Sequence, residues 1–453
     1  MSKKQIYKPR PVSGFPEWLP QVRRVEQQCL DHIRRIFESY GYCSIETPAV
    51  EELDVINAKG GDPAEDGGAD VDKEIYVLER LHKEENDKES RLALHFDQTV
   101  PLARYVAQHF NDLTFPFKRY QMQKVWRGER PQAGRFREFY QCDIDVINPD
   151  HLPRHFDAEM PAIIWEILSS LPGMDQEART GEARTGIIKE HIQLRISNRK
   201  ILLGLLEAQG IEDTVDVTRW IDKLDKIGQG AIEKELGDIG LTSAQITDIL
   251  TLAQTKDIRS VKAQNDTMKE GLEELVFVMD NLAHLPEGAA VADLSIVRGL
   301  DYYTGTVYET VFTDDPGYGS ICSGGRYDDL AGNYINKHLP GVGISIGFSR
   351  LFDRLRDKQK LDTSRISPAD ILVVMPSEEL RGLTAQTAQT LRQRGYNVEQ
   401  YHNPQKIGKQ IGYAEKKGIP YVWFPPFDAD GKHEVKDLSK GEQSEADPQT
   451  WKI

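Results

Sequence analysis

The chain has 453 residues, of which 39% are hydrophobic and 28% charged, and its formal net charge is −15. This length allows two or three domains with cores of their own, and the composition is ordinary for a soluble globular protein. No apolar run is long enough to span a bilayer, and residues Met1–Gln5 lead to no apolar signal core, so we expect a cytoplasmic protein that is neither exported nor inserted in a membrane.

The cysteines also restrict the class of protein. Cys29, Cys43, Cys142 and Cys322 are scattered along the chain without CxxC spacing. This distribution suits a reducing compartment and argues against a zinc knuckle or a disulfide framework. We therefore expect no protein-bound metal centre, and a zinc or redox enzyme has no ligand cluster to support it.

The acidic net charge disfavours a nucleic-acid partner, but its distribution is uneven. Residues 118–137 contain seven Lys or Arg against one acid, and residues 381–417 contain seven against two. Each of these basic segments is either a solvated face or a place where a polyanion binds.

The first predicted element is an amphipathic helix over residues 21–40, where apolar residues recur at spacings of three and four. Gly41 can supply the left-handed conformation that ends a helix. Residues Ile45–Pro48 then predict a strand, because Pro48 does not allow the helix to resume. The glycine- and acid-rich residues 58–72 predict a loop.

Residues Lys118–Asp145 predict two strands joined by the loop Glu129–Arg135. The guanidinium groups of Arg127, Arg135 and Arg137 could converge on phosphates, which they bind in a bidentate manner. Phe139 could stack on a purine. The alternative is a basic antiparallel hairpin without a ligand.

The middle of the chain predicts helices. The sequence Glu-Ala-Arg-Thr-Gly occurs twice in succession at residues 177–186, which indicates a tolerated loop duplication rather than a repeat architecture. Residues 197–285 are rich in Leu, Ile, Lys and Glu, contain no proline, and have a helical pattern.

The run Arg298-Gly-Leu-Asp-Tyr-Tyr-Thr-Gly305 combines a cation, a carboxylate, two phenols and two glycines. In a strand, alternate side chains share a face, so Asp301 and Tyr303 point away from Arg298 unless a bend or bulge intervenes. The run either lines a small polar pocket or forms an edge strand with ordinary aromatic packing. Further on, the strand pattern of Gly341–Arg350 has glycine at alternate positions, which usually means tight packing.

From Pro368 the pattern alternates between strand and helix. This alternation predicts a small α/β domain with a mixed sheet. The predicted strands are 371–375, 396–401 and 420–424, and the predicted helices are 379–394 and 407–417. Core packing is the expected role of Trp423, whereas Tyr413 could stack on bases.

Several of these motifs occur together. The run Arg298–Gly305, the sequence Gly-Gly-Arg-Tyr-Asp-Asp at 324–329, the glycine-containing strand at 341–350 and Arg127-Gly-Glu129 resemble the signature set of histidyl-tRNA synthetases, which are class II enzymes. The resemblance extends from about Pro16 to the C-terminus. It implies an α/β (α+β) fold: an antiparallel-sheet catalytic domain at residues 1–195 and 286–360, a helical insertion at 196–285, and an anticodon-binding domain at 368–453.

The resemblance also implies site residues on the nucleotide side. Arg127 would hold the α-phosphate, Glu129 would help to place ATP, and Phe139 would stack on adenine. Arg135 belongs to the same loop, and Arg350 matches the arginine that meets the γ-phosphate. Ser349 stands where many relatives have an acid. In addition, Arg130 and Gln132 would approach the acceptor end of the tRNA.

On the amino-acid side, the resemblance assigns Asp97 and Thr99 to the substrate amino group, although His95 stands where relatives often carry arginine. Arg298 would be the main catalytic electrophile, and Arg127 a second catalytic residue. The remaining expected contacts to L-histidine are Gln141, Asp145, Tyr303 and Tyr327.

The implied function is the activation of L-histidine with ATP and Mg²⁺, followed by transfer to tRNA(His), in a homodimer without membrane partners. The main alternative is a non-catalytic regulatory paralogue of histidine biosynthesis, which lacks the C-terminal domain and often the hairpin arginines. This chain has both features. Another class II synthetase is a further alternative, but the paired motifs at 298–305 and 324–329 mark the histidine branch.

Overall fold

The computed structural model describes residues 7–57, 74–81, 91–172, 191–297, 303–329, 331–332, 334–358, 360–428 and 431–453. They form two compact units, one with most of residues 7–360 and the other with residues 361–453 together with residues 18–30. Three predicted features lie outside the described residues: the loop at 58–72, the duplication at 177–186 and Arg298.

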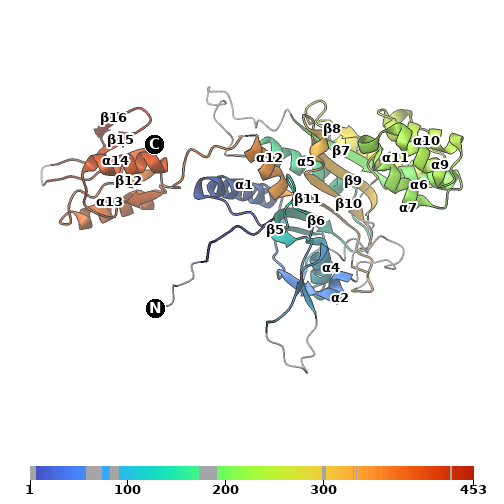
Figure 1. The fold of residues 1–453 in the computed structure, drawn as a ribbon, viewed down its shortest axis with the longest axis horizontal. Coiled ribbons are helices and arrows are strands. Elements are labelled where there is room, and N and C mark those ends of the chain that lie inside the picture. Colours follow the sequence, from blue (N-terminus) through green and yellow to red (C-terminus); the bar gives the residue numbers. More distant parts are fainter. Residues whose placement is uncertain are drawn as a thin grey trace. The chain divides into compact units, whose positions relative to one another are not determined.

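The larger unit is built on an eight-stranded sheet with the order β1-β5-β6-β11-β10-β9-β7-β8 (Figure 1). Neighbouring strands are antiparallel except in the pairs β1/β5 and β7/β8. The strands are β1 (Cys43–Ser44), β5 (Phe117–Trp126), β6 (Glu138–Ile147), β7 (Ile192–Asn198), β8 (Ala290–Ala292), β9 (Tyr303–Phe312), β10 (Cys322–Tyr327) and β11 (Gly341–Ile346). This mostly antiparallel sheet confirms the predicted fold class.

One face of this sheet is apolar and is covered by helices. On β6, alternate residues Cys142, Ile144 and Val146 are fully buried. The helices α5 (His155–Ser169) and α12 (Phe348–Asp357) pack on this side of the sheet. The ring of Phe37, on α1 (Pro20–Ser39), lies 5.8 Å from that of Tyr120 on β5. Burial of these apolar side chains fixes which residues of β5 and β6 point to the other face.

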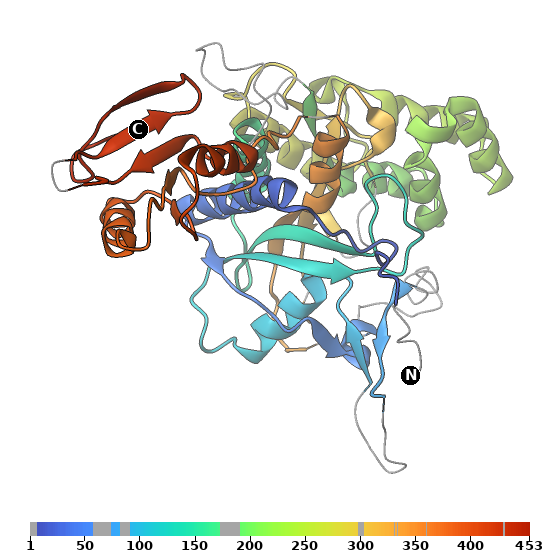
Figure 2. The same cartoon turned by 60° about the vertical axis from the view of Figure 1, so that its left-hand side comes forward.

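The other face carries polar side chains. Figure 2 shows β5 and β6, in teal, side by side in the sheet. The helix α4 (Thr99–Gln108) begins beside them: the side-chain amide of Gln98 donates to the carbonyl oxygens of Gln123, at 3.0 Å, and Gln141, at 3.1 Å. A three-stranded sheet, β2-β4-β3, and a short helix belong to the same unit. Their bounds are β2 (Val50–Glu52), β3 (Val77–Leu78), β4 (Leu92–Leu94) and α2 (Leu53–Asn57).

The predicted helix at 21–40 is confirmed as α1, and Gly41 follows it with a φ of 80°. The strand predicted at Ile45–Pro48 is wrong, because the strand is Cys43–Ser44. The amide of Ile45 still donates to the carbonyl of Tyr120 at 3.0 Å. Pairing with β5 stops there because the chain turns toward the small sheet, and Pro48 has no N–H to continue a ladder.

The hairpin predicted at Lys118–Asp145 is confirmed as β5 and β6. The strand pattern of Gly341–Arg350 needs a correction: β11 ends at Ile346 and α12 begins at Phe348, so Arg350 lies in the first turn of a helix. The β9–β10 pairing has a register shift between Gly325 and Tyr327, next to the start of β9. The bend expected between Arg298 and Tyr303 falls largely outside the described residues.

The helical pattern of residues 197–285 is confirmed, apart from the end of β7. The helices gather at one end of the unit, in green in Figure 1. They are α6 (Arg199–Ala208), α7 (Thr214–Ile221), α8 (Leu224–Ile227), α9 (Gln229–Asp238), α10 (Ser243–Gln254), the 3₁₀ helix η3 (Ile258–Ser260) and α11 (Asp266–Asn281). A second 3₁₀ helix, η4 (Pro316–Tyr318), follows β9. The helices and the main sheet belong to one compact unit, so the bounds of a separate insertion domain stay a prediction.

The smaller unit contains the predicted mixed sheet, with the order β13-β12-β14-β15-β16. The first three strands are parallel and the last two antiparallel. Its elements are β12 (Ile371–Val373), α13 (Arg381–Gln393), β13 (Val398–Gln400), α14 (Ile407–Lys417), β14 (Tyr421–Phe424), β15 (Glu434–Asp437) and β16 (Glu442–Glu445). We did not predict β15 and β16, because their charged sequences have no apolar alternation.

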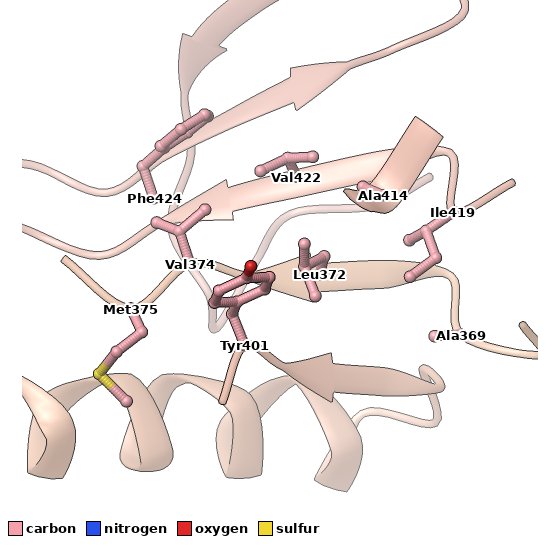
Figure 3. Close-up of a cluster of buried hydrophobic side chains, with 9 residues drawn as sticks. All are labelled: Ala369, Leu372, Val374, Met375, Tyr401, Ala414, Ile419, Val422 and Phe424. Atoms are coloured by element: carbon pink, nitrogen blue, oxygen red, sulfur yellow. The ribbon is translucent and has the colours of Figure 1, made fainter. Parts of the chain in front are cut away.

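The core of this sheet is apolar on both faces. Figure 3 shows the cluster on one face, where Leu372, Val422 and Phe424 come from adjacent strands. On the opposite face Trp423 is fully buried, so its predicted packing role is confirmed. Tyr413 is half-buried, and its hydroxyl donates to Glu399 at 2.5 Å. Base stacking by Tyr413 stays a prediction.

Cys29, Cys43, Cys142 and Cys322 are all free thiols, and burial raises the pKa of Cys322 to about 12. In the described ranges, no helix combines the length and the apolar character needed to cross a membrane.

Candidate active site

Glycines on β10 and β11 open a depression in the polar face of the main sheet. A Cβ atom on Gly343 would overlap the carboxylate of Asp145, and one on Gly341 would overlap the ring of Tyr327. A Cβ atom on Gly325 would lie 2.8 Å from the ring of Tyr303. The tight packing predicted for the alternating glycines is therefore confirmed, and side chains from neighbouring strands occupy the space.

Asp145 is the most constrained acid in this depression. Its Oδ1 accepts a hydrogen bond from the hydroxyl of Tyr327 at 3.1 Å, and its Oδ2 lies 2.6 Å from a guanidinium nitrogen of Arg119. Arg119 is fully buried and is the cross-strand partner of Asp145. Burial raises the pKa of Asp145 to about 6, while Arg119 and Tyr327 oppose the shift. The acid is thus held in one position by a cation on one side and a phenol on the other.

Asp143 lies one step along the same face of β6, and we did not predict it. Its cross-strand partners are Gln121 on β5 and Ser345 on β11, and Ser345 pairs with Ser323 on β10. These four residues form a polar row across the sheet. Burial raises the pKa of Asp143 to about 7, against the opposing effects of Arg119 and the hydroxyl of Ser345. The alternation of Gln141, Asp143 and Asp145 along one strand was visible in the sequence and could have identified it.

Gln141 continues this face toward the hairpin loop. Its side-chain amide donates to the hydroxyl of Ser345 at 2.8 Å. Within the described part of the chain, Oε1 of Gln141 and Oε1 of Gln98 are buried without a hydrogen-bond partner. Buried polar atoms are usually paired, so the unpaired Oε1 of Gln141, a residue that lines a cavity, indicates a place for a ligand or water.

The start of α4 provides the next group of predicted residues. Asp97 is buried, and its Oδ1 accepts from the amide of Val100 at 3.1 Å, which pairs a backbone N–H that the first turn of the helix leaves free. Thr99 lines a small cavity that also contains Asp143, Asp145, Tyr303 and Tyr327. His95 is buried, its Nε2 lies 2.8 Å from the carbonyl oxygen of Lys124, and burial lowers its pKa.

A second cavity of about 250 Å³ lies at the hairpin end of the sheet. Its lining includes the predicted residues Arg127, Glu129, Arg135, Phe139, Gln141 and Arg350. Glu129 lies between two arginines, with its carboxylate oxygens 3.9 Å from Arg127 and 3.3 Å from Arg135. The guanidinium of Arg127 lies 5.2 Å from the ring centre of Phe139. Three cations therefore converge on a cavity with a single carboxylate among its lining residues.

Arg350 reaches this cavity from the first turn of α12. Its guanidinium donates to the carbonyl of Tyr318 and lies 5.1 Å from the centre of that ring. Burial lowers its pKa, and the nearby Arg135 adds to this effect. The hydroxyl of Ser349 accepts from the amide of Tyr140 at 2.9 Å. The carbonyl and the ring of Tyr318 thus position Arg350. The hydrogen bond of Ser349 connects α12 to β6.

The hairpin loop is closed by reciprocal backbone hydrogen bonds between Gln132 and Arg135, of 3.2 and 2.8 Å. Arg130 and Gln132 are exposed on this loop. Gly14 lies against its base and accepts from the amides of Arg137, at 2.8 Å, and Glu138, at 3.2 Å. Arg137, which we expected to converge on phosphates, donates from Nε to the carbonyl of Glu129 and so supports the loop.

Arg326, within the glycine-rich motif at 324–329, has a different surrounding. It forms a buried ion pair with Asp157 at 2.6 Å, which ties β10 to α5. The motif thus combines a structural cation with Tyr327 at the site. Among the described residues, no cluster of three or more His, Cys, Asp or Glu side chains could hold a metal ion.

Comparison with known proteins identifies the class. A family model described as "Histidyl-tRNA synthetase" matches residues 14–351, and one described as "Anticodon binding domain" matches residues 370–450. These matches cover the two units that carry the main sheet and the mixed sheet. The fold is that of an aminoacyl-tRNA synthetase.

Relatives make the identification more specific. The chain is 54% identical to a histidine–tRNA ligase of Thermobifida fusca (strain YX) over 461 aligned residues, covering all of both chains. A crystal structure of histidyl-tRNA synthetase from Nostoc sp. PCC 7120 has a TM-score of 0.82 and 38% identity, covering 98% of this chain and 97% of that one. The chain belongs to the histidyl-tRNA synthetase family.

The regulatory alternative has a weaker match. A structure from Bacillus halodurans C, described as an ATP phosphoribosyltransferase regulatory subunit/histidyl-tRNA synthetase, has a TM-score of 0.69 and 18% identity, covering 90% of this chain and 97% of that one. Identity at this level shows a shared fold alone. The full-length match at 54% identity is to a ligase, so the regulatory paralogue is not supported.

Proposed function

We propose that this protein activates L-histidine with ATP to form histidyl adenylate and pyrophosphate, and then transfers the histidyl group to the 3′ end of tRNA(His). The observation that carries this proposal is the meeting of two unlike cavities. Ser323 and Ser345 line both the acidic, phenol-containing cavity and the arginine-containing cavity. An amino acid in the first cavity and a nucleotide in the second would meet at these serines.

The acidic cavity suits an imidazole. A neutral imidazole has one N–H donor and one acceptor nitrogen, which a carboxylate and a phenol hydroxyl can satisfy. Asp145 and Tyr327 are already hydrogen-bonded to each other at 3.1 Å, and Tyr303 lines the same cavity. An apolar amino acid of similar size would leave these buried groups unpaired, which accounts for specificity without an editing domain. We assign the substrate amino group to Asp97, Thr99 and Gln141.

The arginine-containing cavity suits a triphosphate. We assign the α-phosphate to Arg127 and the γ-phosphate to Arg350, with Arg135 as a further phosphate contact. Phe139 would stack on adenine, and Glu129 would help to orient the nucleotide. With one carboxylate in the lining, the donor set fits Mg²⁺ held mainly by phosphate oxygens, and the ion would supply charge neutralisation at the phosphates.

The chemical steps need no covalent intermediate with the protein. An oxygen of the histidine carboxylate attacks the α-phosphorus, the bond to the bridging oxygen breaks, and pyrophosphate leaves. Arg127 and Arg298 would stabilise the charge that develops on the α-phosphate. A terminal ribose hydroxyl of the tRNA then attacks the adenylate carbonyl, and AMP leaves.

The tRNA would contact both units. Arg130 and Gln132, exposed on the hairpin loop, are positioned for the acceptor end, and the basic face of α14 offers phosphate contacts to the anticodon arm. We further propose that the protein acts as a homodimer in the cytoplasm. Four free cysteines fit a reducing compartment.

Exchange of pyrophosphate into ATP with the purified full-length protein tests the proposal, with each of the twenty amino acids in turn. We expect exchange with L-histidine alone and subsequent charging of a tRNA(His) transcript. Exchange with a different amino acid, or no exchange from folded protein, would contradict the proposal.

A further inference from the structure

Asp143 is a buried acid that the proposed chemistry does not yet use. Its side chain is 4% exposed, and it lines the small cavity beside Asp145. Its Oδ1 has no hydrogen-bond partner within the described residues. An unpaired carboxylate oxygen at such a depth costs free energy unless a ligand pairs with it.

The charges around Asp143 are unbalanced. The like charges of Asp97 and Asp145 disfavour the ionised form of Asp143, whereas the cation Arg119 favours it. Arg119 forms its ion pair with Asp145, at 2.6 Å, so one cation faces both Asp143 and Asp145. Asp97 is engaged at the start of α4. The acids near this point therefore outnumber the described cation that faces them.

The position of Asp143 identifies which part of a substrate it would meet. Its cross-strand neighbour Ser345 lines both cavities, as does Ser323 in the same row. By the proposed function, the substrate carboxylate and the α-phosphate of ATP approach each other here. Both groups are anionic, so an ionised Asp143 would repel them. The α-ammonium group of the amino acid is the one cationic group of the substrate close to its carboxylate.

We propose that Asp143 is a substrate-binding residue that accepts a charge-assisted hydrogen bond from the α-ammonium group of histidine. This inference rests on the proposed function and adds a contact to it. The ammonium group supplies the positive charge that the apo site lacks, and Asp143 draws the amino end toward β6. The adjacent carboxylate then faces the arginine-containing cavity, where the α-phosphate is bound.

Three ligands and the variant Asp143→Asn separate this role from a structural one. L-Histidine has both the ammonium and the carboxylate groups, L-histidinol lacks the carboxylate, and imidazolepropionate lacks the ammonium. Their dissociation constants are measured by calorimetry with the full-length protein. We expect Asp143→Asn to weaken L-histidine and L-histidinol by the same factor, about 30- to 1,000-fold, and to leave imidazolepropionate within about threefold.

Matched controls keep the test specific. Asp238→Asn, on the exposed end of α9, should change none of the three affinities, and Asp143→Glu, which keeps the charge, should recover part of the preference for ammonium-containing ligands. In pyrophosphate exchange, Asp143→Asn should raise the KM for histidine with the KM for ATP within about twofold.

Two outcomes would overturn the assignment. Equal losses for all three ligands would mean that Asp143 only supports the fold of the site, and unchanged affinities would mean that it does not contact the substrate. Both outcomes differ from failure of the proposed function, in which the unaltered protein would show no exchange dependent on histidine.

Discussion

The strands β6 and β12 both have a neighbouring strand on each side, but only β6 buries acidic side chains. All three residues of β12, Ile371–Val373, are fully buried and apolar, and helices α13 and α14 belong to the same unit. β6 buries Cys142, Ile144 and Val146 on the face toward α5 and α12, whereas its other face buries Asp143 and Asp145, at about 5% exposure or less, beside Ile147.

This difference is the one we expect between a strand that contributes only to a core and a strand that lines a ligand site. An apolar strand gains free energy from each buried side chain, about 25 cal/mol per Å². A buried acid costs free energy unless a cation or hydrogen-bond donor compensates it. Arg119 and Tyr327 compensate Asp145, whereas Oδ1 of Asp143 is left unpaired within the described residues. The buried acids on the polar face of the main sheet therefore lower the stability of the fold.

The largest expected effect on activity comes from filling the depression in the polar face of the main sheet. Gly343→Ala places a methyl group where the carboxylate of Asp145 now lies, so Asp145 must move away from Tyr327. We expect kcat/KM for histidine in pyrophosphate exchange to fall by about 1,000-fold or more. Gly408→Ala is the matched control, because a Cβ atom there meets no neighbour within 4 Å. Near-normal exchange by Gly343→Ala would show that the carboxylate position is unimportant.

A substitution in the apolar core of the smaller unit should lower stability and leave pyrophosphate exchange intact. Trp423→Ala removes a fully buried side chain from the smaller unit and should lower its free energy of unfolding by about 3–5 kcal/mol. We expect histidine-dependent exchange to persist, because the two cavities lie in the larger unit, while charging of tRNA(His) is lost. Thermal unfolding and both assays check this separation. Loss of exchange at a temperature where the larger unit stays folded would contradict it.

A smaller effect concerns stability against pH. In the folded protein, burial raises the pKa of Asp143 from the ordinary value of 3.8 to about 7, so the contribution of this group to stability is lost as pH rises from about 4 through 7. Asp143→Asn removes this loss. Relative to the unaltered protein, the variant should gain about 2–4 kcal/mol in free energy of unfolding between pH 5 and pH 8. Urea unfolding at both pH values measures this change, with Asp238→Asn as the exposed control.

If the difference in free energy of unfolding between Asp143→Asn and the unaltered protein is the same at pH 5 and pH 8, the charge of Asp143 is compensated in the unliganded protein. That result would weaken the distinction between the two sheets, because β6 would then carry no uncompensated acid. If Asp143→Asn were more stable than the unaltered protein only below pH 5, the effect would have the wrong sign for a raised pKa.

The smallest effect is expected on α14. Many basic residues of segment 381–417 are engaged: Arg392 and Arg394 donate to backbone carbonyls, and Lys417 pairs with Glu399 at 3.0 Å. Lys409 remains exposed on the helix. Lys409→Glu should raise the KM for tRNA(His) about three- to tenfold at low salt, and less at high salt. Lys358→Glu, an exposed reversal in the larger unit, is the control, and equal effects of both variants would indicate a non-specific charge effect.

The sequence predicted most of the elements because their patterns are local. The helix at 21–40, the hairpin at 118–145 and the strand–helix alternation after Pro368 each follow from periodicity and from turn residues. The charged strands β15 and β16 were missed because their pairing depends on β14, a tertiary neighbour, rather than on their own composition.

The site was harder to predict from single residues. The sequence could not indicate that Gly343 makes room for Asp145, or that Arg119 is buried as its partner, because both facts depend on the register of the three strands β5, β6 and β11. Asp143 was overlooked although it alternates with two predicted residues. The individual roles of the predicted site residues stay predictions, and that of Arg298 concerns a residue outside the described ranges.

A crystal structure of the full-length protein with bound L-histidine would test the central claim most directly. We predict that the imidazole contacts both Asp145 and Tyr327, with the carboxylate directed past Ser345 toward Arg127. Histidine bound elsewhere, for instance in the cavity lined by Arg195 and Lys256 between the sheet and the helices, would contradict it.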